Sequence, residues 1–143
     1  MKIIQNMNSI LRNTLAFIVG TIVGALCNGL IIQLGPLIIP NPEGVDNSSM
    51  ESLKNTIHLF QAKHFIVPFL AHSIGTFIGA FLAVKLCVSH HLKIALIISA
   101  LFFIGGAYMV KLLPAPMWFN VTDLVLAYFP MGYLAFVLGK RKQ

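Results

Sequence analysis

The stretch QAKHFIVPFLAHSIGTFIGAF, residues 61–81, decides the fold. It is apolar enough to enter a lipid bilayer, yet it contains two histidines, a proline and a small residue at every fourth position. Because an α-helix advances about 100° per residue, the polar and small residues share one face and the bulky residues occupy the other. Lipid contacts the bulky face, and a partner helix approaches closely on the small face. We therefore predict a spanning helix that packs through Ala71, Gly75, Gly79 and Ala83, with His64, Pro68 and His72 on the same face.

The whole chain has the composition of a membrane protein. Of its 143 residues, 57% are hydrophobic and 10% are charged, whereas a soluble domain has about 25% charged residues. Four apolar runs reach the roughly 20 residues that a helix needs to cross a bilayer. These runs are residues 15–34, 64–86, 94–113 and 118–138. We predict an all-α fold, with a single transmembrane domain over residues 1–143 in which the four spans form a four-helix bundle.

The basic residues lie at the ends of the apolar runs and predict an orientation, because Lys and Arg mark the cytoplasmic side of a membrane protein. With four spans, one side receives Lys2, Arg12, Lys85, Lys93, Lys140, Arg141 and Lys142, and the other receives Glu43, Asp46, Glu51, Asp123, Lys54, Lys63 and Lys111. We expect an inner (plasma) membrane protein with both termini in the cytoplasm and no carboxylate deep inside a span. A net charge of +6 that is dispersed in this way does not predict nucleic-acid binding.

The long loop between the first two spans is predicted to contain a helix of its own, at about residues 49–62. Ser48 and Glu51 have the spacing of a capping box, in which a hydroxyl and a carboxylate bond the first free backbone N–H groups of a helix. The apolar positions that follow at helical spacing are Met50, Leu53, Ile57 and Phe60. We expect this amphipathic helix to lie at the outer membrane surface. In the fourth span, Pro130 is expected to produce a kink.

Two octapeptides of the first and second spans are similar to each other. They are VGTIVGAL, residues 19–26, and IGTFIGAF, residues 74–81. Because the two spans run in opposite directions, the match is either the trace of an inverted repeat or a common small-xxx-small packing motif. The packing motif is favoured, and Gly20 and Gly24 are then the counterparts of the small residues on the second span. The sequence leaves open whether this seam lies within one chain or between two copies.

The run MESLKNTIHLFQAKHFIVPFLAHSIGTFIGAF, residues 50–81, resembles small, uncharacterised four-span membrane proteins of bacteria. The resemblance covers under a quarter of the chain. It implies a bacterial inner membrane as the location. It implies no activity and assigns no functional residue.

Polar residues inside the membrane are the main candidates for function, since such groups normally face the interior of a bundle. They are Asn28 in the first span and His72, Ser73 and Thr76 in the second. His72 lies about two turns inside its span, where a titratable group can relay protons or bind a ligand. In the alternative interpretation, a neutral His72 bonds to Asn28, Ser73 or a backbone carbonyl and only fixes the helix register.

The remaining titratable residues are weaker candidates. Glu51, His58 and His64 could bind a metal at the outer surface, because imidazole and carboxylate suit zinc. The two histidines are six residues apart, however, and not the four that place two ligands on one helical face. Asp123 is expected either to pair with Lys111 or to be stabilised by a helix N-terminus. The sequence predicts no metal, no cofactor and no catalytic residue.

Three functional hypotheses follow. The first is a non-enzymatic membrane component, either an accessory subunit or a lipid-interacting protein. Its partners are membrane lipids and either a second copy or another membrane protein. The second is a small transporter or channel with a polar path through Asn28, His72, Ser73 and Thr76. The third is a metal- or quinone-handling redox protein that uses His58, His64 and His72.

Overall fold

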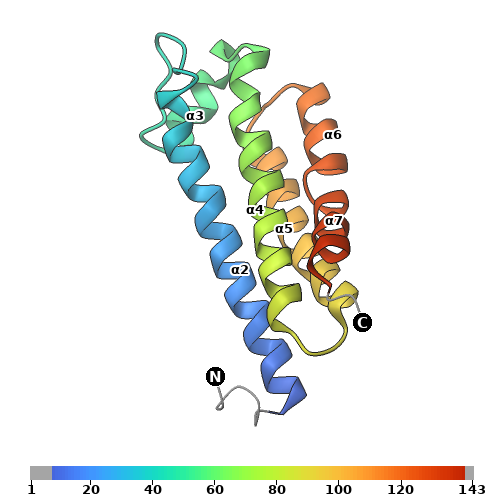
Figure 1. Ribbon diagram of the computed structural model, residues 1–143. Helices are drawn as coiled ribbons and strands as arrows, with labels where there is room; N and C mark the ends of the chain where they lie inside the picture. Colours follow the sequence, from blue (N-terminus) through green and yellow to red (C-terminus); the bar gives the residue numbers. More distant parts are fainter. Residues whose placement is uncertain (1–7, 141–143) are drawn as a thin grey trace.

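The computed structural model of the chain describes residues 8–140, and over these residues the fold is an all-α bundle (Figure 1). Four helical segments are long and apolar enough to cross a membrane, which confirms the predicted four-span architecture. The spanning elements are α2 (Ser9–Leu34), α4 (Ile66–Leu86), α5 (His91–Leu112), and α6 (Met117–Leu126) with α7 (Phe129–Gly139). The segment between the first two spans contains η1 (Gly35–Leu37), α3 (Met50–Thr56), η2 (Ile57–Leu59) and η3 (Ala62–Phe65).

The first span begins six residues before the predicted boundary, at Ser9 and not at Leu15. The cause is Asn8, whose side-chain oxygen accepts a hydrogen bond from the backbone N–H of Ile10 at 3.1 Å. An N-cap of this kind stabilises a helix start by bonding one of its free N–H groups, and it does so independently of the hydropathy of the next residues. With 26 residues, α2 is about 39 Å long at 1.5 Å per residue. Since a bilayer core is about 30 Å thick, we expect α2 to tilt in the membrane.

The glycine seam lies between α2 and α4 of one chain. A Cβ atom added to Gly79 would lie 2.7 Å from the carbonyl oxygen of Gly20, and one added to Gly24 would lie 2.7 Å from that of Gly75. Only glycine allows two backbones to approach so closely. In the alignment of the two octapeptides, Gly20 corresponds to Gly75 and Gly24 corresponds to Gly79. The contact of Gly79 with Gly20 on one helix pair is therefore equivalent to the contact of Gly24 with Gly75 when the helices are exchanged. The similarity therefore has a packing reason: two antiparallel helices present the same surface to each other.

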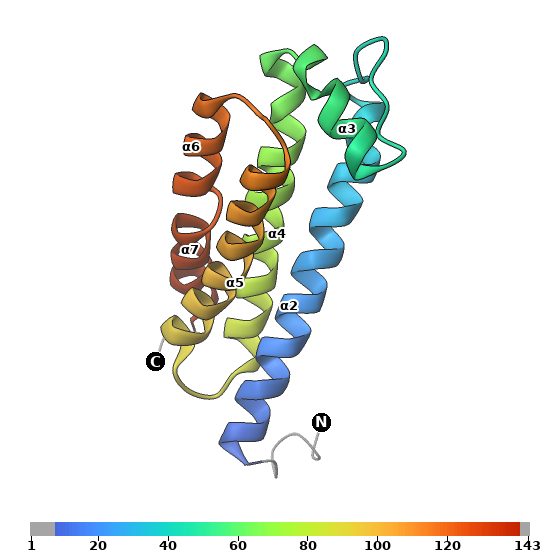
Figure 2. The ribbon, with the colours of Figure 1, turned by 180° about the vertical axis from the view of Figure 1, so that it is seen from behind.

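Small residues fill the half of the bundle near the chain termini, where α4 lies between α2 and the pair α5 and α7 (Figure 2). The fully buried positions there are largely alanines and other small or β-branched residues, namely Ala16, Ala80, Ala83, Val84, Cys87, Ile94, Ala95, Ile98 and Ala135. Gly132 of α7 packs directly against the hydroxyl of Ser99 of α5. Small side chains let helix axes approach and leave little space between them, so this half of the bundle is closed.

The turn from α4 into α5 is held by polar groups of the first span. Asn13 donates a hydrogen bond to the hydroxyl of Ser89 at 2.9 Å and accepts one from the backbone N–H of Val88 at 3.0 Å. His90 follows with φ of 58°, a left-handed conformation that costs about 1 kcal/mol for a non-glycine residue. These contacts fix α2 against the end of α4.

The fourth span is two helices, not one kinked helix. Helix α6 ends at Leu126 and α7 begins at Phe129. Pro130 lies in the first turn of α7, where a missing N–H is tolerated, but it cannot donate to the carbonyl of Leu126 as a continuous helix would require. The break therefore leaves Tyr128 outside helical geometry and free to direct its side chain into the bundle.

The amphipathic segment is shorter than predicted. Its helix α3 has seven residues, and Ser49, not Ser48, is the N-cap, because the Ser49 hydroxyl accepts from the backbone N–H of Ser52 at 3.0 Å. The chain then continues through η2 and η3 into α4. Ile57 is buried against Phe65 and Phe119. The apolar face of the segment thus packs onto the bundle.

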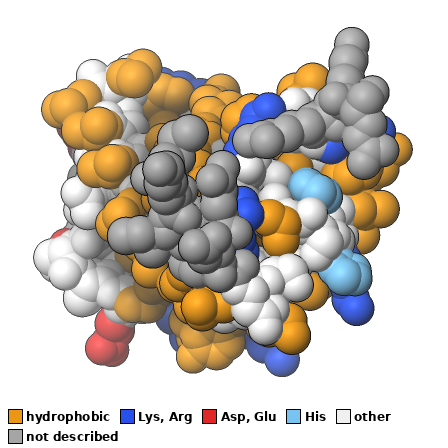
Figure 3. Space-filling model, turned by 60° about the horizontal axis from the view of Figure 1, so that its bottom comes forward, with side chains coloured by type: hydrophobic (Ala, Val, Ile, Leu, Met, Phe, Trp, Pro, Cys, Tyr) orange, Lys and Arg blue, Asp and Glu red, His pale blue; other side chains and the backbone are white. Residues whose placement is uncertain are grey.

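The acidic residues lie toward the α3 end of the bundle together with Lys54, Lys63 and Lys111, and the other described basic residues lie at the opposite end. Arg12, Lys85, Lys93 and Lys140 lie at the end that carries both termini, where Figure 3 shows lysine, arginine and histidine side chains among hydrophobic ones. The expected basic residues Lys2, Arg141 and Lys142 lie outside the described residues. At the other end, hydrogen bonds from the side chain and then the backbone of Ser48 hold the pKa of Asp46 below its usual value, so the α3 end keeps negative charge.

The glycine seam yields the first testable prediction. Gly79→Ala forces a Cβ atom against the backbone of α2, and we expect it to lower the free energy of unfolding by about 2 kcal/mol, as overpacking does elsewhere. Gly29→Ala is the matched control, because a Cβ atom there meets nothing within 4 Å and alanine favours helix. Chemical unfolding in detergent, followed by circular dichroism, measures both. Equal stability of the two variants would contradict the seam.

Candidate functional site

A cavity of about 910 Å³ lies inside the α3 end of the bundle. Its volume is in the range of small-molecule binding sites, which is about 300–1,000 Å³. Its wall comes from α2 (Asn28, Ile32, Gln33), α4 (Val67, Pro68, His72), α5 (Phe102, Gly105, Met109) and α6 (Phe119, Asn120, Asp123), and the segment at Met50, Leu53, Ile57 and Phe60 covers it. The predicted apolar face of that segment is therefore a cavity wall. Most of the lining is apolar, and His72, Asp123 and Tyr128 form a hydrogen-bonded polar cluster at the deep end.

One side of the cavity is open between α2 and α5. A Cβ atom added to Gly105 meets nothing within 4 Å, although Gly105 lines the cavity. Ile32 and Tyr108, which also line it, are 40% and 61% exposed. Because these exposed residues belong to spanning helices or their ends, the opening faces the surroundings of the bundle at the level of the α3 end.

The deep end of the cavity contains a pair of oppositely chargeable side chains from two different spans. The Nδ1 atom of His72 lies 2.9 Å from both carboxylate oxygens of Asp123. The hydroxyl of Tyr128 donates to Oδ2 of the same carboxylate at 3.0 Å. Asp123 is only 3% exposed. An ionised carboxylate only accepts hydrogen bonds, so the contact with ionised Asp123 requires the form of His72 that carries its hydrogen on Nδ1.

The break in the fourth span positions Tyr128 for this role. Its ring stacks on the imidazole of His72 with centroids 5.8 Å apart and meets Phe103 edge-on at 5.9 Å. Its hydroxyl end lies directly over Gly106, where any side chain would collide with it. An interrupted spanning helix is a common way to place polar groups inside a membrane protein. Here the interruption supplies the second donor to Asp123.

Asn120 adds an acceptor to the same wall. It lies one helical turn before Asp123 on α6, so the two side chains share a face. Its amide nitrogen donates to the carbonyl oxygen of Ala115 at 3.2 Å. Its Oδ1 atom is buried and has no hydrogen-bond partner among the described residues, and the whole side chain is 8% exposed. A buried polar atom without a partner is costly, which makes Oδ1 a contact point for a ligand or a water molecule.

The predicted polar path is only partly brought together. Asn28 and His72 line the cavity, but Ser73 and Thr76 do not. The hydroxyl of Ser73 donates to the carbonyl of Phe69 at 2.7 Å, and that of Thr76 donates to the carbonyl of His72 at 2.7 Å. Serine and threonine hydroxyls in membrane helices commonly donate to a backbone carbonyl of the preceding turn in this way. The polar groups therefore end at His72, and the packed small residues lie beyond it.

The residues predicted as outer ligands do not converge. Glu51 and His58 are exposed and lie outside the cavity lining, whereas His64 is buried and lines it. The Nδ1 atom of His64 accepts from the backbone N–H of Gln61 at 2.9 Å, which caps the start of η3. Within residues 8–140, no group of three or more His, Cys, Asp or Glu side chains is placed to hold a metal ion.

The structure corrects the expectation for Asp123. Its partners are His72 and Tyr128, while Lys111 is exposed and makes no ion pair with it. Asp123 lies in the first part of its span, where the predicted span at residues 118–138 placed it, and it is buried there at 3% exposure. Asp123 is six residues after the start of α6 at Met117, and His72 is six residues after the start of α4 at Ile66. Each side chain therefore lies about 9 Å along its helix, at 1.5 Å per residue. The predicted spans start at residues 64 and 118 and place the two side chains eight and five residues in, so the equal depth becomes visible only with the helix boundaries of the structure.

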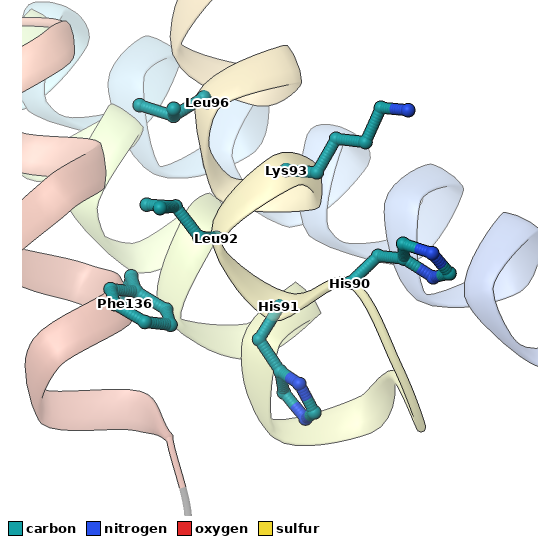
Figure 4. A pocket seen from close by; sticks show the side chains of 6 residues that line it. All are labelled: His90, His91, Leu92, Lys93, Leu96 and Phe136. Atoms are coloured by element: carbon teal, nitrogen blue, oxygen red, sulfur yellow. The ribbon is translucent and has the colours of Figure 1, made fainter.

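A second depression, of about 500 Å³, lies between α5 and α7 near the chain termini. Figure 4 shows Leu92, Leu96 and Phe136 toward each other, while His90, His91 and Lys93 point away from them. The depression is a shallow apolar surface on which no polar groups converge. It is therefore a weaker candidate than the cavity at the α3 end.

Comparison with known proteins adds no assignment. No model of a known protein family, no curated protein sequence and no solved structure matches the chain. Function is therefore argued from the cavity and from the residues that line it.

The cluster of His72, Asp123 and Tyr128 gives the second prediction. Tyr128→Phe removes one hydrogen bond to a buried carboxylate and should lower the free energy of unfolding by about 1–2 kcal/mol. Tyr133→Phe, in an exposed residue of α7, is the control and should change it little. In the Asp123→Asn background, the effect of Tyr128→Phe should be smaller, because the hydroxyl then contacts a neutral group. Equal effects of Tyr128→Phe in both backgrounds would contradict the contact.

Proposed function

We propose that this chain is a non-enzymatic membrane component that binds a lipid-like amphipathic molecule in the cavity at its α3 end. The observation that carries the proposal is the combination of a cavity of about 910 Å³ with an apolar wall and a polar deep end. Such a site suits a ligand with an apolar body and one polar group, because the few convergent polar atoms orient it. Nothing in this arrangement requires bond-making chemistry.

The position of the opening supports a ligand that comes from the membrane. Ile32 and Tyr108, which line the cavity, are exposed beside it. A molecule dissolved among acyl chains could enter the cavity laterally, with its polar group directed toward His72 and Asp123. Membrane lipids are therefore the first proposed partners. A second copy or another membrane protein contacting the exposed face of α2 is the other proposal.

The proposed location is the inner membrane of a bacterium, with both termini in the cytoplasm. Two arguments support it. Four of the seven described basic residues, and no acidic residue among residues 8–140, lie at the end that carries the termini, which is the pattern of cytoplasmic ends. The resemblance of residues 50–81 to small bacterial four-span proteins points to the same membrane. In this orientation the cavity opens on the external side.

A small transporter is the second candidate function, and the buried pair of His72 and Asp123 favours it. Ionisable residues inside membrane spans commonly mark ion and substrate pathways. Transport would require the closed half around Ala80 and Ala95 to open, because both are fully buried. Solute flux into proteoliposomes that is abolished by His72→Ala in a folded protein would favour transport over simple binding.

The metal- or quinone-handling alternative has less support. It requires His58, His64 and His72 to act together. His58 is exposed and does not line the cavity, and His64 uses Nδ1 as a cap for η3. Metal analysis and an absorption spectrum of the purified protein test this alternative directly.

The cavity gives the third prediction. Gly105→Phe adds a bulky side chain at a lining position where a Cβ atom meets nothing within 4 Å, and it should reduce retention of a bound amphiphile about tenfold or more, equivalent to about 1.4 kcal/mol. Gly29→Phe is the control, since a Cβ atom there also meets nothing within 4 Å but Gly29 does not line the cavity. Native mass spectrometry of protein extracted in a mild detergent measures the retained molecule. Equal retention by the two variants would overturn cavity binding.

A further inference from the structure

The polar atoms at the deep end of the cavity are arranged to receive hydrogen bonds. Tyr128 and His72 direct their donors at Asp123. An ionised carboxylate has about four acceptor positions, so Asp123 retains acceptor capacity after these contacts. Asn120 directs its amide N–H group at Ala115 and leaves Oδ1 without a partner among the described residues. A ligand group that meets this wall must therefore be a hydrogen-bond donor.

The two acceptors lie on one face of the same helix. Asn120 and Asp123 are three residues apart on α6, and both line the cavity. Side chains at this spacing are neighbours on a helix surface. Both are more than nine-tenths buried, at 8% and 3% exposure. An ammonium group carries three N–H donors and can contact the amide oxygen and the carboxylate together.

The charge of the lining also favours a cation. Asp123 is the one acidic residue in it, and it contains no lysine or arginine. Two histidines are present. His72 donates to Asp123, and His64 lies two turns closer to the α3 end with Nδ1 engaged by the backbone of Gln61. In a medium of low dielectric constant, a carboxylate attracts a cation far more strongly than in water.

Because the lining contains no lysine or arginine, it favours an amine without a phosphate group over an aminophospholipid. An aminophospholipid would bring a phosphate group with its ammonium, and that phosphate would find no basic side chain in the cavity and a carboxylate nearby. A single-chain amine has no such group. Its alkyl chain would lie along the apolar wall at Phe102, Met109 and Phe119.

We propose, building on the lipid-like ligand argued above, that the cavity binds a long-chain primary amine from the outer leaflet. The ammonium group contacts the carboxylate of Asp123 and the Oδ1 atom of Asn120. The alkyl chain extends toward the opening between α2 and α5. The cavity therefore distinguishes ligands by the charge of the polar end, and it prefers a cationic end to a neutral or anionic one.

The test compares three labelled amphiphiles that share one chain: dodecylamine, dodecanol and dodecanoate. Each is titrated into phosphatidylcholine nanodiscs that contain the protein, and saturable binding is measured above that of empty nanodiscs. We expect dodecylamine to bind about tenfold or more tightly than dodecanol, with dodecanoate weakest, as a buried carboxylate requires. Comparable binding of dodecanol, or stronger binding of dodecanoate, would overturn the preference for amines.

Two variants test whether the preference for an amine depends on Asp123. Asp123→Asn retains the shape of the side chain and removes its charge, and it should abolish the difference between dodecylamine and dodecanol. Glu43→Gln removes a charge from an exposed residue at the same end of the bundle and should leave the difference unchanged. If Asp123→Asn cannot be recovered folded, the comparison of the three amphiphiles on the unaltered protein decides the question.

The outcome also separates this proposal from the one on which it rests. If all three amphiphiles bind equally and Gly105→Phe weakens each of them, cavity binding stands and the amine is wrong. If no amphiphile binds saturably, and Gly105→Phe does not change the retained native molecule, the proposed function itself fails.

Discussion

The contact between His72 and Asp123 is the interaction on which the arrangement of this bundle depends. A carboxylate inside a span cannot remain unpaired, because removing an isolated charge from water is prohibitively costly. Asp123 is satisfied only when α6 stands beside α4 at the depth of His72 and when the chain breaks so that Tyr128 can donate as well. Removing one partner of such a pair typically costs about 3–5 kcal/mol. The pair therefore fixes the position of the fourth span against the second.

The cavity follows from an uneven distribution of side-chain size along the spans. Toward the termini, glycines and alanines bring α2, α4, α5 and α7 into close contact. Toward the α3 end, Phe102, Phe119 and the bulky residues of the segment that covers the cavity hold the helices apart. Gly20 and Gly24 meet Gly79 and Gly75 in the closed half, whereas Asn28, one turn beyond Gly24, already lines the cavity. A bundle that is closed at one end and hollow at the other can hold a ligand with access from one side.

The sequence predicts what depends on hydropathy and on local helix faces. It predicts the four spans, the small-residue seam on α4 and the apolar face of the segment after Ser49. It could not predict contacts that depend on how distant helices are set against each other. Asp123 was expected to pair with Lys111 or to be stabilised by a helix N-terminus, because hydropathy places the span at residues 118–138 but does not reveal which helices lie beside it. Ser73 and Thr76 were predicted to continue a path because they are polar residues inside the second span, but the sequence cannot show that each hydroxyl bonds the preceding turn of its own helix.

The most direct test of this account measures whether His72 lies next to Asp123 in a lipid bilayer. Solid-state nuclear magnetic resonance of protein with ¹⁵N-labelled histidine and ¹³C-labelled aspartate suits it, because Asp46 and Asp123 are the two aspartates of the chain. The account predicts one strong correlation between a histidine Nδ1 and an aspartate carboxyl carbon, consistent with the 2.9 Å distance from nitrogen to oxygen, and its loss in His72→Ala. Absence of any such correlation in the unaltered protein would contradict the pair, and with it the polar end of the cavity.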